Sequence, residues 1–301
     1  MNMATSPNNR PNRVLVTGAS GFIGRYLVEF LETAGIAVRS FSRRDISRRD
    51  HVIGDVLSDV TTAAVDCDCI VHLAGDADAS ASYERPLDFA RVNVLGTVRA
   101  LEAARWNNAR FILASSMRVY RPSARPITED APLGPVDPYG QSKAQAEQWT
   151  ELYARIYGIR ATTLRVFSVY GPGQVSGVSS GVVGIFFRTS REGLPLRVRA
   201  RQLRDFVDVR DVARAIGLAI FNPPESYAVY NIGTGKTTSI AELGDMVRKI
   251  VGSTMPTIVD LTPGAESYVA DTRRAASELG FEAQIELADG LVWYNRHINT
   301  G

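Results

Sequence analysis

The sequence predicts an α/β protein, a doubly wound parallel sheet with a smaller C-terminal lobe. Apolar runs of strand length alternate with segments of helical periodicity through the first half of the chain. This alternation is typical of parallel strands joined by crossover helices. A glycine-rich turn stands between the first strand and the first helix. Beyond Gly171 the alternation weakens over a glycine-rich stretch that ends at Gly184, which indicates a second lobe.

A polar N-terminal tail precedes the first strand. Residues 1–12 are predicted to be a flexible tail, and residues 13–16 are predicted to form an apolar strand. Residues 17–24 read Thr-Gly-Ala-Ser-Gly-Phe-Ile-Gly and form the turn. Apolar side chains then recur at helical spacing, at Ile23, Leu27, Phe30 and Leu31. The predicted order is therefore strand, glycine turn, helix.

The later elements continue this pattern and define two lobes. Strands are predicted at residues 37–41, 70–73, 110–114, 162–167 and 206–209, and helices at residues 86–106, 139–157, 211–221 and 240–251. Residues 13–174 together with 204–235 are assigned to the sheet domain. Residues 175–203 together with 236–301 are assigned to the smaller lobe.

Composition and charge exclude several classes of protein. No run of 18 uncharged apolar residues occurs, and the N-terminus lacks the apolar core of a signal peptide, so we expect a cytoplasmic protein without a membrane partner. The formal charge of +2 gives no basic stripe, which argues against nucleic-acid binding. All basic residues except Lys143, Lys236 and Lys249 are arginine, and these arginines suit either a solvated surface or phosphate contacts.

The few cysteines and histidines predict neither a disulfide nor a metal site. Cys67 and Cys69 lie two residues apart, too close in an extended chain for a relaxed bridge. His51, His72 and His297 are scattered without ligand spacing, so no metal is assigned. We expect His72 to be a packed residue at the end of a strand.

The glycine turn predicts a binding site for a dinucleotide. Gly18, Gly21 and Gly24 follow a strand directly and open a helix. The missing Cβ atoms let backbone N–H groups approach a pyrophosphate at the helix N-terminus. The context of strand and helix makes this interpretation stronger than that of a turn that binds nothing.

The end of the second strand bears on the choice between NAD and NADP. An acidic residue at this place binds the ribose 2′-hydroxyl of NAD, whereas here Ser42 is followed by Arg43 and Arg44. A hydroxyl and two guanidinium groups suit a 2′-phosphate, so the sequence favours NADP, with NAD and a solvated arginine pair as the alternatives. Asp55 is expected to meet the adenine amino group.

A serine, a tyrosine and a lysine have the spacing of a catalytic set for proton exchange. Tyr139 and Lys143 lie four residues apart at the start of a predicted helix and therefore share a face. A free tyrosine has a pKa of about 10, so a nearby cation is needed for it to exchange a proton at neutral pH. Ser116 follows the predicted strand 110–114, at a sheet edge where such clefts lie.

The order of the motifs resembles that of a known family. The motifs are the glycine turn at 17–24, His-Leu-Ala-Gly at 72–75, Tyr-Gly-Gln-Ser-Lys at 139–143, and the segments 86–97, 164–173, 204–211 and 231–235. From Val14 to about Leu291 the chain is similar to the extended short-chain dehydrogenase/reductases, in particular the NAD-dependent epimerase/dehydratase group. The resemblance implies a Rossmann-like fold and a nucleotide-sugar substrate.

The resemblance assigns residues to the predicted site. Ser116, Tyr139 and Lys143 fall on the catalytic positions, and Arg204 falls on an arginine that binds the substrate diphosphate. The predicted cofactor contacts are Gly18, Ser20, Gly21, Phe22, Ile23, Gly24, Ser42, Arg43, Arg44, Asp55, Val56, Leu73, Ala74, Gly75, Asn93, Ser115, Tyr139, Lys143 and Val166. The predicted substrate contacts are Ser116, Met117, Ser168 and Arg204.

The resemblance also implies a homodimer. Helices 86–106 and 139–157 of two copies would form a four-helix seam, with the same surface of each copy in contact. Trp106, Trp149 and Trp293 are predicted to be core or interface anchors.

The chain departs from the family pattern at three places. Dehydratases of the family have acidic residues after the catalytic hydroxyl, whereas Met117 and Arg118 follow Ser116 here, so elimination of water is not expected. Ser168 stands where asparagine is common, and residues 261–264 lack a second phosphate arginine. Arg197, Arg199 and Arg201 are candidates to replace that contact, or they form a solvated strand face.

These residues favour hydride transfer at a ring carbinol of a nucleotide-linked sugar, with C4 as the expected position. Two outcomes remain open, a 4-epimerase, which the motifs favour, and a 4-ketoreductase, which Ser42, Arg43 and Arg44 favour. An NADP-dependent reductase or dehydrogenase of a small carbonyl compound or sugar that carries no nucleotide is a second hypothesis. A non-catalytic dinucleotide sensor or scaffold is a third.

Overall fold

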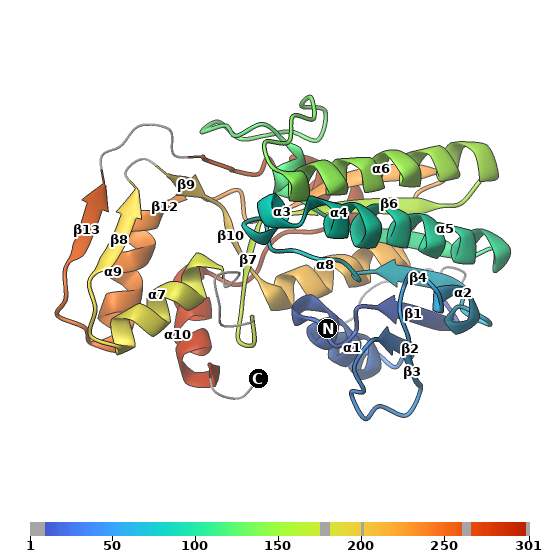
Figure 1. The fold of residues 1–301 in the computed structure, drawn as a ribbon, viewed down its shortest axis with the longest axis horizontal. Helices are drawn as coiled ribbons and strands as arrows, with labels where there is room; N and C mark the ends of the chain where they lie inside the picture. The colour runs from blue at the N-terminus through green and yellow to red at the C-terminus, as the bar shows by residue number, and fades with distance from the viewer. Residues whose placement is uncertain (1–9, 175–180, 200–201, 261–265, 299–301) are drawn as a thin grey trace.

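The computed structural model describes residues 10–174, 181–199, 202–260 and 266–298. Within these ranges seven strands form one sheet in the order β11-β6-β5-β4-β1-β2-β3, and every neighbouring pair is parallel. Helices cover both faces of the sheet (Figure 1). The predicted doubly wound parallel sheet is confirmed. Arg201, residues 261–264, residues 1–9 of the predicted tail and the predicted lobe boundary at 175 lie outside the described residues.

The strands of the sheet are short and mostly buried. They are β1 (Arg13–Thr17), β2 (Ala37–Ser42), β3 (His51–Ile53), β4 (Cys69–His72), β5 (Arg110–Ser116), β6 (Ala161–Val166) and β11 (Tyr227–Ile232). β4 and β6 are buried along their whole length, as expected for parallel strands covered on both faces. The sequence prediction did not include β3 and β11, the two edge strands.

Two helical layers enclose the sheet. Helices α1 (Phe22–Thr33) and α8 (Val209–Phe221) pack on one face, and α2 (Val60–Ala63), α5 (Gly96–Trp106) and α6 (Pro138–Tyr157) pack on the other. The predicted helix 86–106 consists of α4 (Pro86–Phe89), a π-helical segment (Ala90–Leu95) and α5. The short helix α3 (Ala81–Glu84) precedes it.

Local sequence signals place the start and end of α6. The Asp137 carboxylate accepts a hydrogen bond of 2.7 Å from Gly140 N and caps the helix, and Pro138 occupies its first turn. The helix ends at Gly158, whose φ of +69° is the left-handed conformation that glycine adopts without strain. These signals set Tyr139 in the first turn of α6.

The second lobe has its own apolar core. It contains α7 (Val182–Arg191), α9 (Ile240–Val251) and α10 (Leu287–His297), and the paired strands β8 (Leu196–Arg199) with β13 (Thr257–Asp260) and β9 (Leu203–Arg204) with β12 (Thr238–Ser239). β10 (Phe206–Asp208) pairs with β7 (Ser168–Tyr170) outside the main sheet. The predicted strand at 206–209 therefore exists, and β11 is the strand by which residues 204–235 return to the main sheet.

A buried polar network joins β5, α6 and β6. The Glu147 carboxylate on α6 accepts hydrogen bonds from Arg165 Nε and Nη2 on β6, the latter at 2.7 Å, and from the Ser115 hydroxyl on β5. Arg165 Nη1 donates to the Tyr120 hydroxyl at 2.6 Å, and that hydroxyl donates to Asn231 Oδ1 on β11. All the charged groups of this network are thus paired.

Candidate active site

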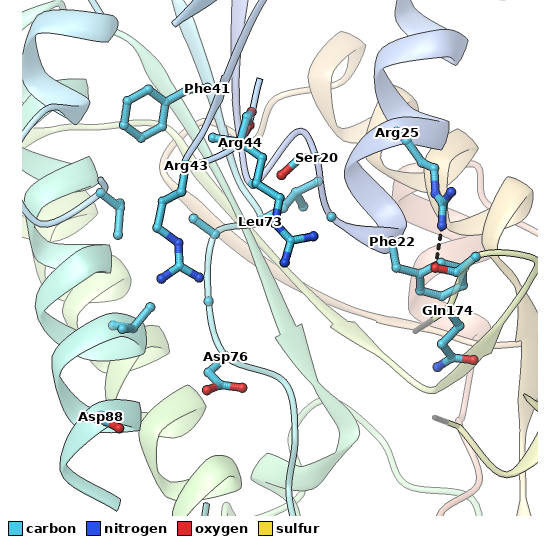
Figure 2. A pocket seen from close by; sticks show the side chains of 18 of the residues that line it. Ser20, Phe22, Arg25, Phe41, Arg43, Arg44, Leu73, Asp76, Asp88 and Gln174 are labelled. Atoms are coloured by element: carbon cyan, nitrogen blue, oxygen red, sulfur yellow. Dashed lines mark hydrogen bonds between the residues drawn. The ribbon is translucent and has the colours of Figure 1, made fainter. Parts of the chain in front are cut away.

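A cleft of about 1580 Å³ opens at the carboxyl ends of β1, β2 and β4 and reaches α7 and α10. This is where ligands bind in sheets of this kind. Predicted cofactor contacts that line it are Gly18, Ser20, Gly21, Phe22, Ser42, Arg43, Arg44, Asp55, Val56, Leu73, Ala74 and Gly75 (Figure 2).

The glycine turn is packed so closely that side chains do not fit there. Gly18 has a φ of +69°, and a Cβ on it would lie 2.8 Å from Ala74 N. A Cβ on Gly24 would lie 2.2 Å from Gly18 O. α1 begins at Phe22, directly after the turn, so its free N–H groups face the cleft. The turn therefore fits the pyrophosphate of a dinucleotide, with Gly24 serving the packing of helix against strand.

The end of β2 presents two arginines to the cleft. Figure 2 shows the side chains of Arg43 and Arg44 extending into it, on the side where Asp76 lies. Neither guanidinium has a hydrogen bond or ion pair with any residue that the structure describes. The Ser42 hydroxyl instead donates to Arg44 O at 2.7 Å and shapes the turn. Any phosphate contact here thus comes from the two guanidiniums rather than from Ser42.

The three predicted catalytic residues, which we call the catalytic set, lie together beside this cleft. Ser116 ends β5, Tyr139 lies in the first turn of α6, and Lys143 lies one turn further on. Lys143 Nζ donates to Ala114 O on β5 at 2.9 Å. The catalytic set is buried and does not itself line the cleft, but a Cβ on Gly75 would lie 3.5 Å from Lys143 Nζ. The catalytic set therefore adjoins the cleft at Gly75.

Burial shifts the proton equilibria of both titratable members of the catalytic set. Burial lowers the pKa of Lys143 to about 8, with the Glu147 carboxylate acting in the opposite direction. Burial raises the pKa of Tyr139, whereas the hydrogen bond with Ser116 and the charge of Arg118 lower it. A lysine that titrates near neutrality and a tyrosine held by a serine are suited to proton transfer.

Asn93 joins the wall of the cleft to α6. Its Oδ1 accepts from Asp76 N at 2.8 Å, and its Nδ2 donates to Asp76 O and to the Ser142 hydroxyl, both at 2.9 Å. Because Ser142 directly precedes Lys143, Asn93 connects this part of α6 to the loop that follows β4.

Several other predicted cofactor contacts lie away from the cleft. Ser115 points into the buried network through its bond to Glu147. Val166 is a buried residue paired in register with Ser116, and Ile23 packs in the core between α1 and the sheet. Asp55 does line the cleft, with one carboxylate oxygen accepting from Leu57 N at 2.9 Å.

The predicted substrate contacts gather near Ser116, at the junction of the two lobes. Arg204 is buried with its guanidinium 5.1 Å from the centre of the Tyr268 ring, and burial lowers its pKa to about 10. The Ser168 hydroxyl donates to Met117 Sδ at 3.7 Å, so these two side chains contact each other directly. Arg197 and Arg199 are exposed on β8, which agrees with the solvated alternative.

Sequence reasoning missed many residues of the cleft. These are Arg25, Phe41, Gly54, Leu57, Asp76, Arg85, Asp88, Arg91, Val92, Gly173, Gln174, Gly184, Arg188, Arg191, Glu192, Tyr294 and Ile298. Phe41 and Gly54 adjoin predicted residues and could have been found that way. Arg188 and Tyr294 come from α7 and α10, which reach the cleft only through the packing of the second lobe. No local signal marks them.

The remaining expectations concern metals, cysteines and membranes. Across the described ranges, no group of three histidine, cysteine, aspartate or glutamate side chains could hold a metal ion. Cys67 and Cys69 are free and buried. His72 is buried, stacks on Phe111 and bonds the Thr17 hydroxyl at 2.9 Å, as the prediction of a packed residue requires. None of the described helices is both long and apolar enough to cross a bilayer.

Comparisons with known proteins agree with this geometry. Residues 14–233 match the model of the NAD dependent epimerase/dehydratase family. The chain is 32% identical over 305 residues to UDP-glucose 4-epimerase of Mycolicibacterium smegmatis. The aligned region covers 93% of this chain and 96% of that protein.

Two solved structures are similar over nearly the whole chain. MoeE5 in complex with UDP-glucuronic acid and NAD has a TM-score of 0.88 at 32% identity, covering 96% of this chain and 99% of that one. UDP-glucose 4-epimerase with UDP-glucose from Thermotoga maritima has a TM-score of 0.87 at 28% identity, with coverage of 96% and 99%.

The buried ammonium of Lys143 predicts a conflict between catalysis and stability. We expect Lys143→Met to lower kcat by about 100-fold or more, and to raise the free energy of unfolding at neutral pH by about 1 kcal/mol. The unfolded chain holds this proton up to pH 10.5 and the folded protein only to about 8, so charge on Lys143 opposes folding. As the pH rises from 8 to 10.5, the free energy of unfolding of the wild type should therefore increase relative to that of Lys143→Met.

Urea unfolding at several pH values measures this difference, with the exposed lysine variant Lys249→Met as the control. A Lys143→Met variant that is less stable than wild type at neutral pH, or that keeps full activity, would contradict the prediction.

Proposed function

Because the chain belongs to the NAD-dependent epimerase/dehydratase family of extended short-chain dehydrogenase/reductases, we propose that this enzyme is a 4-epimerase of a uridine-diphosphate-linked sugar. The observation that carries the proposal is the catalytic set placed beside the dinucleotide cleft at Gly75. The relatives named as UDP-glucose 4-epimerases, and the UDP-glucuronic acid and UDP-glucose in the two similar structures, support the uridine nucleotide.

The residues of the site fit a C4 oxidation followed by reduction on the opposite face. When bound, the nicotinamide ring supplies the hydride acceptor and donor. Tyr139 takes the proton of the C4 hydroxyl and returns it after the sugar ring has turned its other face to the nicotinamide. Ser116 holds the C4 oxygen by a hydrogen bond. Lys143 stabilises the tyrosinate by its charge. Gly18, Gly21 and the N-terminus of α1 would hold the pyrophosphate of the dinucleotide.

Arg204 is suited to bind the substrate diphosphate. It is buried, with 7% of the residue exposed, and its Nη1 donates to Leu203 O and Glu266 O, so other donors of the guanidinium remain available. The cost of burying this cation would be offset by a diphosphate anion. Met117 and Arg118 supply no acid or base for the elimination of water, in agreement with an epimerase rather than a dehydratase.

Arg43 and Arg44 favour NADP as the dinucleotide. Both guanidiniums face the cleft at the position where an acidic side chain would bind the 2′-hydroxyl of NAD. The similar structure of MoeE5 contains NAD, so this arginine pair is the feature of the present chain that argues for the 2′-phosphate. It is also the observation that favours a second function, a 4-ketoreductase that consumes NADPH.

Turnover of sugar nucleotides tests the proposed function. We expect the enzyme, with NADP or NAD present, to convert UDP-glucose to UDP-galactose or UDP-glucuronic acid to its 4-epimer, without net change in the reduced dinucleotide. Chromatography of the sugar nucleotides measures the product, and Tyr139→Phe is the inactive control. Stoichiometric loss of NADPH with a 4-keto sugar nucleotide would instead identify the ketoreductase. Absence of both activities would contradict the proposal.

Substitution of the arginine pair tests the choice of dinucleotide. We expect Arg43→Ala with Arg44→Ala to weaken NADP binding by about 100-fold, because each charge-assisted hydrogen bond is worth about 1.5 kcal/mol. NAD binding should be unchanged. Calorimetry of both dinucleotides measures this, with Arg49→Ala, an exposed arginine outside the cleft, as the control. Equal weakening of both dinucleotides, or tighter native binding of NAD than of NADP, would overturn the preference.

We further propose that two copies associate through α4, α5 and α6. α5 and α6 run side by side (Figure 1), and together with α4 they expose large apolar side chains. Leu87 is 77% exposed, Trp106 67% and Ile156 53%. Single exposed apolar residues are normal on a surface, but several large ones on adjacent helices support an interface there.

Light scattering tests the dimer. We expect twice the chain mass for the native protein and the monomer mass for Trp106→Glu, since a charge buried in an apolar interface is not solvated. Leu194→Glu, at a residue 51% exposed in the second lobe, is the control and should remain dimeric. A monomeric native protein at micromolar concentration would rule the seam out.

A further inference from the structure

Arg118 contacts both Ser116 and the start of α6, although the proposed function gives it no role. Its backbone N donates to the Ser116 hydroxyl at 3.2 Å. Its Nη1 donates to Asp137 Oδ2 at 2.6 Å and to the Glu266 carboxylate at 3.3 Å. Its guanidinium lies 6.0 Å from the centre of the Tyr268 ring, the same ring that Arg204 contacts.

The backbone at Arg118 is also packed against the start of α6. A Cβ on Gly140 would lie 2.3 Å from Arg118 O, so the short turn after Ser116 and the first turn of α6 are in direct backbone contact. Asp137 caps α6 through Oδ1 while Arg118 holds Oδ2. Arg118 thus contacts Ser116 through its backbone N, and the start of α6 through its carbonyl oxygen and its guanidinium. These contacts fix the position of Ser116 relative to Tyr139.

The ion pair between Arg118 and Asp137 also affects the charge balance around Tyr139. The groups that act on the phenol are the Ser116 hydroxyl, Asp137 before α6, Asp76 after β4, and Arg118. The two carboxylates disfavour a tyrosinate. Asp137 has only 1% of its side chain exposed, so solvent screens its charge little, and Arg118 is the cation that compensates it.

We propose that Arg118 is a positioning residue that holds the Ser116 and Tyr139 hydroxyls in register and, by compensating Asp137, supports the anionic form of Tyr139. It acts through Asp137 and Ser116 rather than by contact with the substrate. The charge of Arg118 is the first Coulombic cause that lowers the pKa of Tyr139, which supports the same conclusion. The role rests on the proposed function, since it concerns the base of that reaction.

The expected effect is a shift in pH dependence. Arg118→Met removes the charge at similar length, leaves Asp137 uncompensated, and should raise the apparent pKa of kcat/KM that belongs to Tyr139 by about one unit. At pH values below that pKa, kcat/KM should then fall by about tenfold. Arg118→Lys restores the cation and should return the pKa toward the native value. Arg118→Met combined with Asp137→Asn should also return the pKa toward the native value, because the carboxylate that Arg118 compensates is then absent. The helix start is preserved, because Asn still caps α6.

A titration without turnover separates this proposal from the proposed function. The ultraviolet absorbance of tyrosinate is measured against pH for wild type and for Arg118→Met, each with its Tyr139→Phe counterpart subtracted, so that only Tyr139 is seen. We expect the Tyr139 transition to move upward in Arg118→Met. This titration can be measured even if no sugar nucleotide is converted. Absence of conversion would overturn the proposed function but not the effect of Arg118 on Tyr139.

Arg121→Met, at an exposed arginine three residues further along, is the matched control and should leave both measurements unchanged. Equal pKa values in Arg118→Met and wild type, with activity reduced by the same factor at every pH, would show a purely structural role and overturn the proposal. If Arg118→Met does not fold, the double variant Arg118→Met, Asp137→Asn is compared with Asp137→Asn alone, because these two differ only in the charge of Arg118. A lower Tyr139 pKa in Asp137→Asn alone supports the proposal, and equal pKa values in the two variants overturn it.

Discussion

The buried ion pair between Glu147 and Arg165 is the constraint on which the geometry of the site depends. Glu147 lies one turn after Lys143 on α6, and Arg165 is paired in register with Ser115, the neighbour of Ser116. Both carboxylate oxygens and both sides of the guanidinium are used, with side-chain exposures of 3% and 7%. Such a pair is weak evidence of stability but strong evidence of specificity, because any other rotation of α6 would leave a buried charge unpaired.

The same carboxylate sets the electrostatics of the catalytic lysine. Glu147 is the group that raises the Lys143 pKa against the effect of burial. Arg165 and the Ser115 hydroxyl also bind Glu147, so the carboxylate is fixed in place. One side chain therefore fixes the rotation of α6 and raises the pKa of a lysine whose pKa is lowered by burial. The same buried network therefore sets both the rotation of α6 and the negative charge that acts on Lys143.

The sequence predicted those parts of the site whose residues lie next to a local signal. The glycine turn, the strand end at Ser116 and the four-residue spacing of Tyr139 and Lys143 are all encoded within a few residues, because a turn or a helix face fixes them locally. Ser115 shows the limit of this reasoning. It shares the strand end with Ser116, but the pleat turns its hydroxyl to the opposite side, toward Glu147. Contacts such as Arg188 and Tyr294 depend on how the second lobe packs, which no short pattern contains.

The placement of Arg118 and Arg204 on one tyrosine ring links the binding end of the site to its catalytic end. Two guanidiniums near the same ring repel one another, and the charge of Arg118 contributes to the lowered pKa of Arg204. Glu266 joins them, since its carboxylate accepts from Arg118 and its carbonyl from Arg204. A diphosphate at Arg204 would relieve this repulsion, yet its negative charge would also disfavour a tyrosinate nearby. Arg118 lies among these groups and, through Asp137, lets the site bind an anion and keep a basic tyrosine at the same time.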